Sequence, residues 1–235
     1  MAQYIDQRHL SLPYVIDTHA HADHLTAMPF LKKRYRALTV TGTRVGEVQR
    51  IFRDIYNLGV DFPVDGRQFD TLLDEGQDLK VGSFRIRAMH TPGHTPAHMS
   101  WQVEDAVFVG DTLFMPDYGT ARCDFPGGSA DQLYDSIQRI YALPDSTRLF
   151  MCHDYQPGGR ELRFVSSVAE QKQSNVQLRQ GTTKQEYVKL RTARDAKLAM
   201  PALILPAIQI NIRAGELPEP EANGTAYLKI PLNVF

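Results

Sequence analysis

The chain has 235 residues, of which 43% are hydrophobic and 23% charged, so it can bury a sizeable core and has an ordinary globular composition. Its net charge of −1 argues against nucleic acid or an anionic membrane as a partner. With 2 cysteines, no secretory signal and no apolar run long enough to span a bilayer, we expect a cytoplasmic protein.

Apolar periodicity divides the N-terminal half into short strands and helices. The clearest helix is 45–57, where apolar residues recur at three- and four-residue spacing. A basic cluster suits the C-terminal end of an earlier helix, 25–35, although Pro29 is unfavourable inside a helix. The other expectations in this half are strands over 14–16 and 36–40 and a loop over 59–66.

The middle of the chain predicts two hairpins, which pair 78–81 with 84–89 and 99–103 with 106–109. In the strand 84–89, Phe84, Ile86 and Ala88 alternate with arginines, and this pattern predicts one buried face. The remaining expectations are a strand over 148–152, helices from Ser129, near 164–176 and over 183–198, and an extended run over 226–230.

The stretch 18–24 reads THAHADH and directly follows the strand predicted at 14–16. It holds four candidate metal ligands within six residues, namely His19, His21, Asp23 and His24. We expect Asp23 and His24 to enter the first turn of the next helix. Imidazoles and a carboxylate around one small volume suit a cation that keeps open coordination positions.

Three further candidate ligands follow predicted strands. They are His94, Asp111 and His153, after the strands 84–89, 106–109 and 148–152 respectively. Chemistry in α/β folds is commonly placed where strands run into loops. A single histidine after a strand is more often a surface or capping residue. The repetition of the pattern, in chain order after HxHxDH, indicates a metal site.

This ordered set of ligands resembles the metallo-β-lactamase superfamily over about residues 14–155. The resemblance implies an α/β fold of the αββα sandwich type, with two mixed sheets and helices outside. We expect a single domain over 1–235, with its core at about 14–155 and C-terminal helices and an extended tail over 156–235. Only 18 residues precede His19, so the N-terminal strands of the family are expected to be missing.

Two members of the superfamily that handle glutathione-derived thiols fit this ligand set. Diiron flavoproteins of the superfamily carry Glu where this chain has His21, which argues against their chemistry. Nucleases of the superfamily bind polyanions, and the near-neutral charge of this chain argues against that function. Resemblance to persulfide dioxygenase implies one Fe(II) per chain on His19, His94 and Asp111. His21, Asp23, His24 and His153 would then orient ligands or waters. Resemblance to glyoxalase II implies instead two Zn(II) ions held by all seven residues.

The segment 119–128, GTARCDFPGG, resembles the G-x-x-R-x-D-F segment of persulfide dioxygenases, and His153-Asp154-Tyr155 resembles their H-D-Y. The tail from Ile208 resembles the bacterial branch of that family, which includes β-lactamase hydrolase-like proteins. The resemblance therefore implies an enzyme, an Fe(II)-dependent persulfide dioxygenase in sulfide detoxification. It would oxidise glutathione persulfide with O₂ to sulfite and glutathione.

Two residues are candidates for substrate binding. Arg122 suits a substrate carboxylate, since its planar fork matches one, but pairing with Asp124 to brace the loop is an equal alternative. Tyr155 can donate to the substrate or to a metal-bound water, or simply pack. We expect both cysteines, Cys123 and Cys152, to be structural, with Cys152 buried in an apolar strand.

The short N-terminus raises further alternatives. Without the preceding strands, the strand at 14–16 would expose an apolar edge. Either the chain is a truncated form of a longer protein, or it covers that edge by forming a homo-oligomer.

Besides persulfide oxidation and thioester hydrolysis, a third function also stays open. The chain could be a catalytically silent module that binds persulfides.

Overall fold

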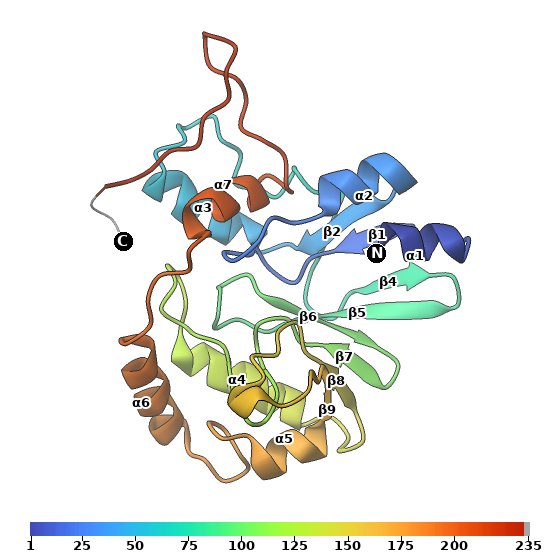
Figure 1. Ribbon diagram of the computed structural model, residues 1–235, viewed down its shortest axis with the longest axis vertical. Helices are drawn as coiled ribbons and strands as arrows, with labels where there is room; N and C mark the ends of the chain where they lie inside the picture. The colour runs from blue at the N-terminus through green and yellow to red at the C-terminus, as the bar shows by residue number, and fades with distance from the viewer. Residues whose placement is uncertain (233–235) are drawn as a thin grey trace. The chain divides into compact units, whose positions relative to one another are not determined.

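The computed structural model describes residues 1–232, and the chain divides into two compact units (Figure 1). The terminal unit comprises Met1–Leu73 and the C-terminal residues from Ala199, and the central unit comprises Asp74–Leu198. The single domain expected over 1–235 stays a prediction. Within residues 1–232, no helix is long and apolar enough to cross a bilayer.

The terminal unit contains a three-stranded sheet in the order β1-β2-β3, which is parallel throughout and not mixed as expected. Its strands are β1 (Tyr14–Ile16), β2 (Leu38–Gly42) and β3 (Thr71–Leu73), connected by the helices α2 (Met28–Tyr35) and α3 (Val45–Ile55). Parallel neighbours need such helical crossovers. The sequence did not predict β3, because three residues carry no readable periodicity. In residues 1–232 no strand precedes β1, and the helix α1 (Ala2–Gln7) lies there instead.

The helices of the terminal unit differ from the expected ones at two places. The helix predicted over 25–35 begins at Met28, which places Pro29 in the first turn, where a missing N–H costs nothing. The sequence did not predict the helix α7 (Ile204–Asn211), which forms within the C-terminal stretch. Pro206 is tolerated because it too lies in a first turn. Residues 226–230 form no strand, and the Gln209 side chain bonds the main chain of Lys229 in both directions.

The central unit contains a six-stranded mixed sheet in strand order β4 to β9. The strands are β4 (Asp78–Val81), β5 (Phe84–His90), β6 (Met99–Val103), β7 (Ala106–Phe108), β8 (Arg148–Phe150) and β9 (Val165–Ser167). Both predicted hairpins are confirmed, and only β7 and β8 pair in parallel. The predicted buried face of β5 is wrong at Phe84, which is exposed beside the hairpin turn, and right at Ala88, which is buried.

Three helices pack on one face of this six-stranded sheet, and the core of the central unit lies between these helices and the sheet. They are α4 (Ala130–Tyr141), α5 (Val168–Ser174) and α6 (Lys184–Asp195), and a 3₁₀ turn lies at Pro157–Gly159. The predicted apolar side of α4 is confirmed, since Leu133, Ile137 and Ile140 are fully buried against Val107 and Leu149. The helix predicted near 164–176 begins only at Val168, because its first residues form β9.

Candidate metal centre

The first candidate ligands lie in the loop between β1 and α2 of the terminal unit. His19 is buried, whereas Asp23 and His24 are exposed. The expectation that Asp23 and His24 enter a helix is wrong, because α2 begins four positions after His24, at Met28. Freed from helical geometry, the loop is able to turn its donor atoms toward one another.

The side chains of this loop gather closely. The ring centroids of His19 and His21 are 4.2 Å apart, and those of His21 and His24 are 4.3 Å apart. His24 Nδ1 lies 3.1 Å from Asp23 Oδ1. One donor atom from each of His21, Asp23 and His24 falls within 4.8 Å of the others. The clustering predicted from THAHADH is therefore present within the terminal unit.

Asn211, at the C-terminal end of α7, holds this loop in place. Its side-chain NH₂ donates to the carbonyl oxygens of His21 at 2.7 Å and His24 at 2.8 Å, and its Oδ1 accepts from Thr26 N at 2.9 Å. Asn211 is buried, so these bonds are shielded from water. This role could not be predicted from sequence, because Asn211 lies 190 positions from His21.

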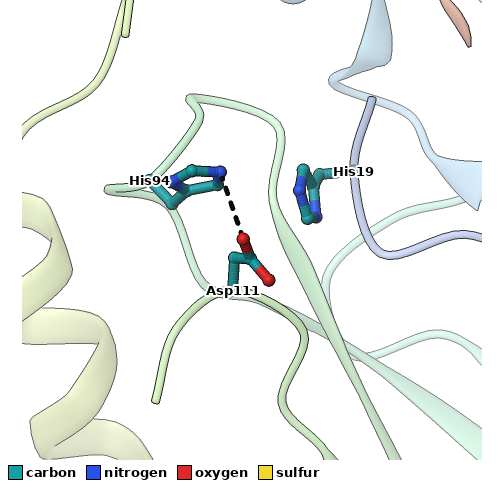
Figure 2. A group of neighbouring side chains, drawn as sticks. All are labelled: His19, His94 and Asp111. Atoms are coloured by element: carbon teal, nitrogen blue, oxygen red, sulfur yellow. Dashed lines mark ion pairs between the residues drawn. The ribbon is translucent and has the colours of Figure 1, made fainter. Parts of the chain in front are cut away.

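The central unit brings His94, Asp111 and His153 together around one carboxylate. His94 Nε2 lies 3.6 Å from Asp111 Oδ2, the pair drawn with a dashed line in Figure 2. His153 Nε2 lies 3.6 Å from the other oxygen, Asp111 Oδ1. Their arrangement follows from the parallel pairing of β7 and β8, because Asp111 and His153 both lie just past the C-terminal ends of these strands.

These separations fit a metal ion better than direct hydrogen bonds. A distance of 3.6 Å is too long for an N–H···O bond. Zinc binds nitrogen and oxygen ligands at about 2.0–2.2 Å, so two such ligands of one tetrahedral ion lie somewhat under 4 Å apart. Histidine nitrogens and a carboxylate are also suitable donors for Fe(II) and Zn(II). The donor set of the central unit therefore suits a transition metal.

The loop before α4 fixes the direction of His94. Its Nδ1 lies 2.8 Å from the carbonyl oxygen of Arg122, which, as acceptor, selects the tautomer whose Nε2 lone pair is directed at a metal. Gly93 has φ +142°, and a Cβ there would lie 2.4 Å from Leu133 Cα of α4. Only glycine allows the main chain to lie this close to α4, so Gly93 places the neighbouring His94 beside that helix.

The segment 119–128, which contains Arg122, is anchored from α6 by a buried ion pair. Arg191 Nε donates to Asp195 Oδ1 at 2.9 Å, and Arg191 also donates to the carbonyl oxygen of Thr120 at 3.0 Å. Asp195 Oδ2 accepts from Cys123 N at 2.9 Å. Arg191 and Asp195 are 1% and 5% exposed, so this ion pair lies in the protein interior. The sequence did not predict this anchor.

The two predicted substrate-binding residues lie in this unit too. Arg122 makes two bonds to Asp124, each 2.6 Å long, so the alternative in which this pair braces the loop is confirmed. Tyr155 is half exposed and stacks on Tyr118 with ring centroids 4.2 Å apart. Contact of either residue with a substrate stays a prediction.

The two cysteines differ in burial, and only one of them agrees with expectation. Cys123, expected to be structural, is buried, and burial raises the pKa of its thiol. Cys152 was expected to be buried but is exposed, because β8 ends at Phe150 and leaves Cys152 in the following loop. Its thiol lies 2.7 Å from Asp111 Oδ1.

Comparison with known proteins identifies the family. Residues 2–153 match the model of the metallo-beta-lactamase superfamily, which covers more than half of the chain. The chain therefore belongs to the metallo-beta-lactamase superfamily, and its expected fold class is confirmed.

Curated relatives with about half of their residues identical are named mainly for hydrolysis. A probable metallo-hydrolase of Burkholderia pseudomallei is 54% identical, with 94% of this chain and 79% of the relative covered. Glyoxylase B2 of Dictyostelium discoideum is 50% identical, with 98% and 80% covered. A beta-lactamase hydrolase-like protein of Agrobacterium fabrum is 53% identical over 99% of this chain, which spans only 53% of that relative. The predicted link to the hydrolase-like branch is confirmed.

More distant relatives are named for persulfide oxidation. The human mitochondrial persulfide dioxygenase ETHE1 is 29% identical, with 91% of this chain and 74% of the relative covered. The crystal structure of ETHE1 from Myxococcus xanthus has a TM-score of 0.74 and 31% identity, and covers 92% of this chain and 83% of its own. The resemblance to the persulfide dioxygenase family is thereby confirmed.

Proposed function

We propose that this chain is an Fe(II)-dependent persulfide dioxygenase that acts in the cytoplasm in sulfide detoxification. Its substrates would be glutathione persulfide and O₂, and its products sulfite and glutathione. The proposed iron ligands are His19, His94 and Asp111. Two histidines and one carboxylate leave coordination positions open for substrates on Fe(II).

The observation that carries this proposal is the contact between the segment 119–128 and His94. This segment is where the sequence resembles persulfide dioxygenases most specifically. Its Arg122 carbonyl oxygen bonds His94 Nδ1 at 2.8 Å, and the Phe125 ring packs edge-on against the imidazole with centroids 5.0 Å apart. The residues that distinguish the family thus set the orientation of a proposed iron ligand.

The reaction balances with one water molecule. The terminal sulfur of the persulfide takes both atoms of O₂ and one oxygen from water, the S–S bond breaks, and glutathione leaves as the thiol. Iron, when bound, supplies the redox chemistry. The chain would hold the reactants together, and His21, Asp23, His24 and His153 would orient ligands and waters.

Arg122 and Tyr155 are the proposed contacts for the glutathione part of the substrate. Arg122 lies beside the Phe125 ring, with its guanidinium carbon 5.1 Å from the ring centroid. Because Asp124 already binds this guanidinium, a substrate carboxylate would have to share it or displace Asp124. Tyr155 is half exposed, and its ring packs against Tyr118 and against the buried Phe114.

A second candidate function is supported by the names of the 50–54% identical relatives. It is glyoxalase II-type hydrolysis of a glutathione thioester at two Zn(II) ions. In that case His21, Asp23, His24 and His153 would be metal ligands, and Asp111 would bridge. Its two oxygens lie toward His94 and His153 respectively, an arrangement that also suits a bridge.

A direct comparison of the two substrates separates these functions. Anaerobically purified protein is reconstituted with Fe(II) or with Zn(II) and offered glutathione persulfide or a glutathione thioester. We expect persulfide-dependent O₂ consumption with iron and negligible thioester hydrolysis with either metal. Thioester hydrolysis by the zinc form, with no O₂ consumption by the iron form, would establish the hydrolase instead. Binding of persulfide without turnover by either form would indicate a silent binding module.

A further inference from the structure

A succession of aromatic rings leads away from His153 in the central unit. The His153 ring lies 6.0 Å from the Tyr155 ring, measured between centroids. Tyr155 stacks in turn on Tyr118, with centroids 4.2 Å apart and an interplanar angle of 21°. The buried Phe114 packs edge-on against both tyrosines and supports the pair from within the protein. The two stacked tyrosines therefore form a supported platform that begins beside the proposed metal centre.

Arg194, near the C-terminal end of α6, lies at the far end of this platform. Its guanidinium carbon is 5.3 Å from the Tyr118 ring centroid, and its side chain is exposed. Arg122 is already paired with Asp124, and Arg160 with two aspartates. Among residues 1–232, by contrast, no carboxylate forms an ion pair with Arg194. Its hydrogen-bond donors are therefore available to an anion that comes from solution.

We propose that Arg194, held over Tyr118, binds a carboxylate of the glutathione part of the substrate and so selects persulfides that carry one. This inference rests on the proposed persulfide oxidation and adds a specificity-determining residue to it. The planar fork of arginine matches a carboxylate. Stacking on an aromatic ring restricts the guanidinium before binding, so that less freedom is lost when the carboxylate arrives.

The dimensions of glutathione suit this placement. It is a tripeptide with a carboxylate at each end and the sulfur on its central residue, and three extended residues span about 10 Å. This is the scale of the platform, whose centroid steps are 6.0 Å from His153 to Tyr155 and 4.2 Å across the tyrosine pair. The peptide would lie along the tyrosines, with one carboxylate at Arg194. Binding then does not require Asp124 to release Arg122.

Binding of S-methylglutathione tests the inference without turnover, because its sulfur is a thioether and carries no persulfide. Isothermal titration calorimetry compares four forms of the protein: wild type, R194Q, R194K and K189Q. Lys189 is an exposed cation of the same helix, so K189Q removes the same charge and is the matched control. The diethyl ester of S-methylglutathione, blocked at both carboxylates, is the second ligand.

We expect R194Q to weaken the binding of S-methylglutathione about 10-fold, which is the loss typical of hydrogen bonds to a charged group. R194K should recover part of this loss, and K189Q should bind like the wild type. The diethyl ester should bind the wild type and R194Q equally. The inference is overturned if the wild type does not bind S-methylglutathione, if R194Q binds it like the wild type, or if R194Q weakens acid and ester to the same extent.

The iron-loaded protein gives a second readout. R194Q should raise the KM for glutathione persulfide about 10-fold and leave kcat nearly unchanged, because a contact remote from the reacting sulfur stabilises ground state and transition state equally. A wild type that binds S-methylglutathione but consumes no O₂ would contradict the proposed oxidation and leave the role of Arg194 valid. Normal binding by R194Q would contradict the role of Arg194 and leave the oxidation untouched.

Discussion

Asp195 accepts a hydrogen bond from the main-chain nitrogen of Cys123 at 2.9 Å, across 72 positions of sequence. The same carboxylate is paired with Arg191, and both side chains are buried. Through this pair α6 holds the segment 119–128, whose Arg122 carbonyl in turn bonds His94. The orientation of one proposed iron ligand thus depends on a buried ion pair in a helix beyond the predicted core of 14–155.

Replacing Arg191 by methionine should therefore destabilise the protein strongly. The change leaves the Asp195 carboxylate buried without its partner, which typically costs about 3–5 kcal/mol. Urea denaturation followed by circular dichroism measures the loss. R148M is the control, because Arg148 pairs with Asp105 at the surface and its loss should leave the midpoint close to that of the wild type. Equal midpoints for R191M and R148M would contradict a structural role for the buried pair.

Replacing Asn211 by alanine should loosen the loop of His19 to His24. The change removes three hydrogen bonds and leaves the buried groups they satisfied without partners, at a cost of about 1–3 kcal/mol for each group that water cannot reach. We expect a lower thermal midpoint and weaker metal binding. N223A changes an exposed asparagine in a loop and should alter neither quantity. Unchanged metal affinity in N211A would show that α7 does not organise this loop.

Asp154 should contribute a pH-dependent part of the stability. Two bonds from the Arg160 guanidinium, each 2.7 Å long, hold the pKa of Asp154 well below its usual range. A carboxyl whose pKa is depressed by folding stabilises the protein above its unfolded pKa of about 3.9, and this contribution is lost as the pH falls toward the folded pKa. D154N should therefore be less stable than the wild type at pH 7.

The stability difference between wild type and D154N should then shrink as the pH falls below about 4. Urea midpoints of both proteins measured from pH 7 to pH 2.5 give this difference directly. Subtracting the two curves removes the carboxylates that are distant from Asp154 and leaves Asp154 together with Asp117, which shares the Arg160 guanidinium. A difference that stays constant across this range would contradict the assignment.

Removing the bound metal should lower the thermal midpoint. A ligand that binds only the folded state stabilises it by about 2.7 kcal/mol at a free concentration of 100 times its Kd. We expect addition of Fe(II) or Zn(II) to the metal-free protein to raise the midpoint, and the increase to be much smaller in D111A, which lacks the shared carboxylate. Calorimetry under anaerobic conditions measures both. A D111A protein that responds to metal like the wild type would exclude Asp111 as a ligand.

The candidate ligands could be predicted from sequence because each lies at the end of a locally readable strand. His94, Asp111 and His153 follow apolar runs, and the parallel pairing of β7 and β8 brings the last two together as expected of strand ends. Their clustering needed no knowledge of distant contacts. The predicted membership of His19 in the same centre joins residues of both units and stays a prediction.

The supporting residues could not be predicted, because their roles depend on distant tertiary partners. Asn211 acts on His21 from 190 positions away, and nothing near Asn211 in the sequence indicates it. The helix that carries Asn211 was not predicted, although its Pro206 lies in the first turn, where proline is tolerated. Cys152 was misplaced because the strand predicted over 148–152 ends two residues earlier.

Oxygen consumption by the iron-loaded protein tests the central claim most directly. Protein purified anaerobically is analysed for metal, glutathione persulfide is added, and O₂ uptake and sulfite are measured together. We predict about one iron per chain, O₂ uptake that requires persulfide, and one sulfite formed for each O₂ consumed. Two zinc ions per chain, with no persulfide-dependent O₂ uptake even after iron reconstitution, would contradict the assignment as a persulfide dioxygenase.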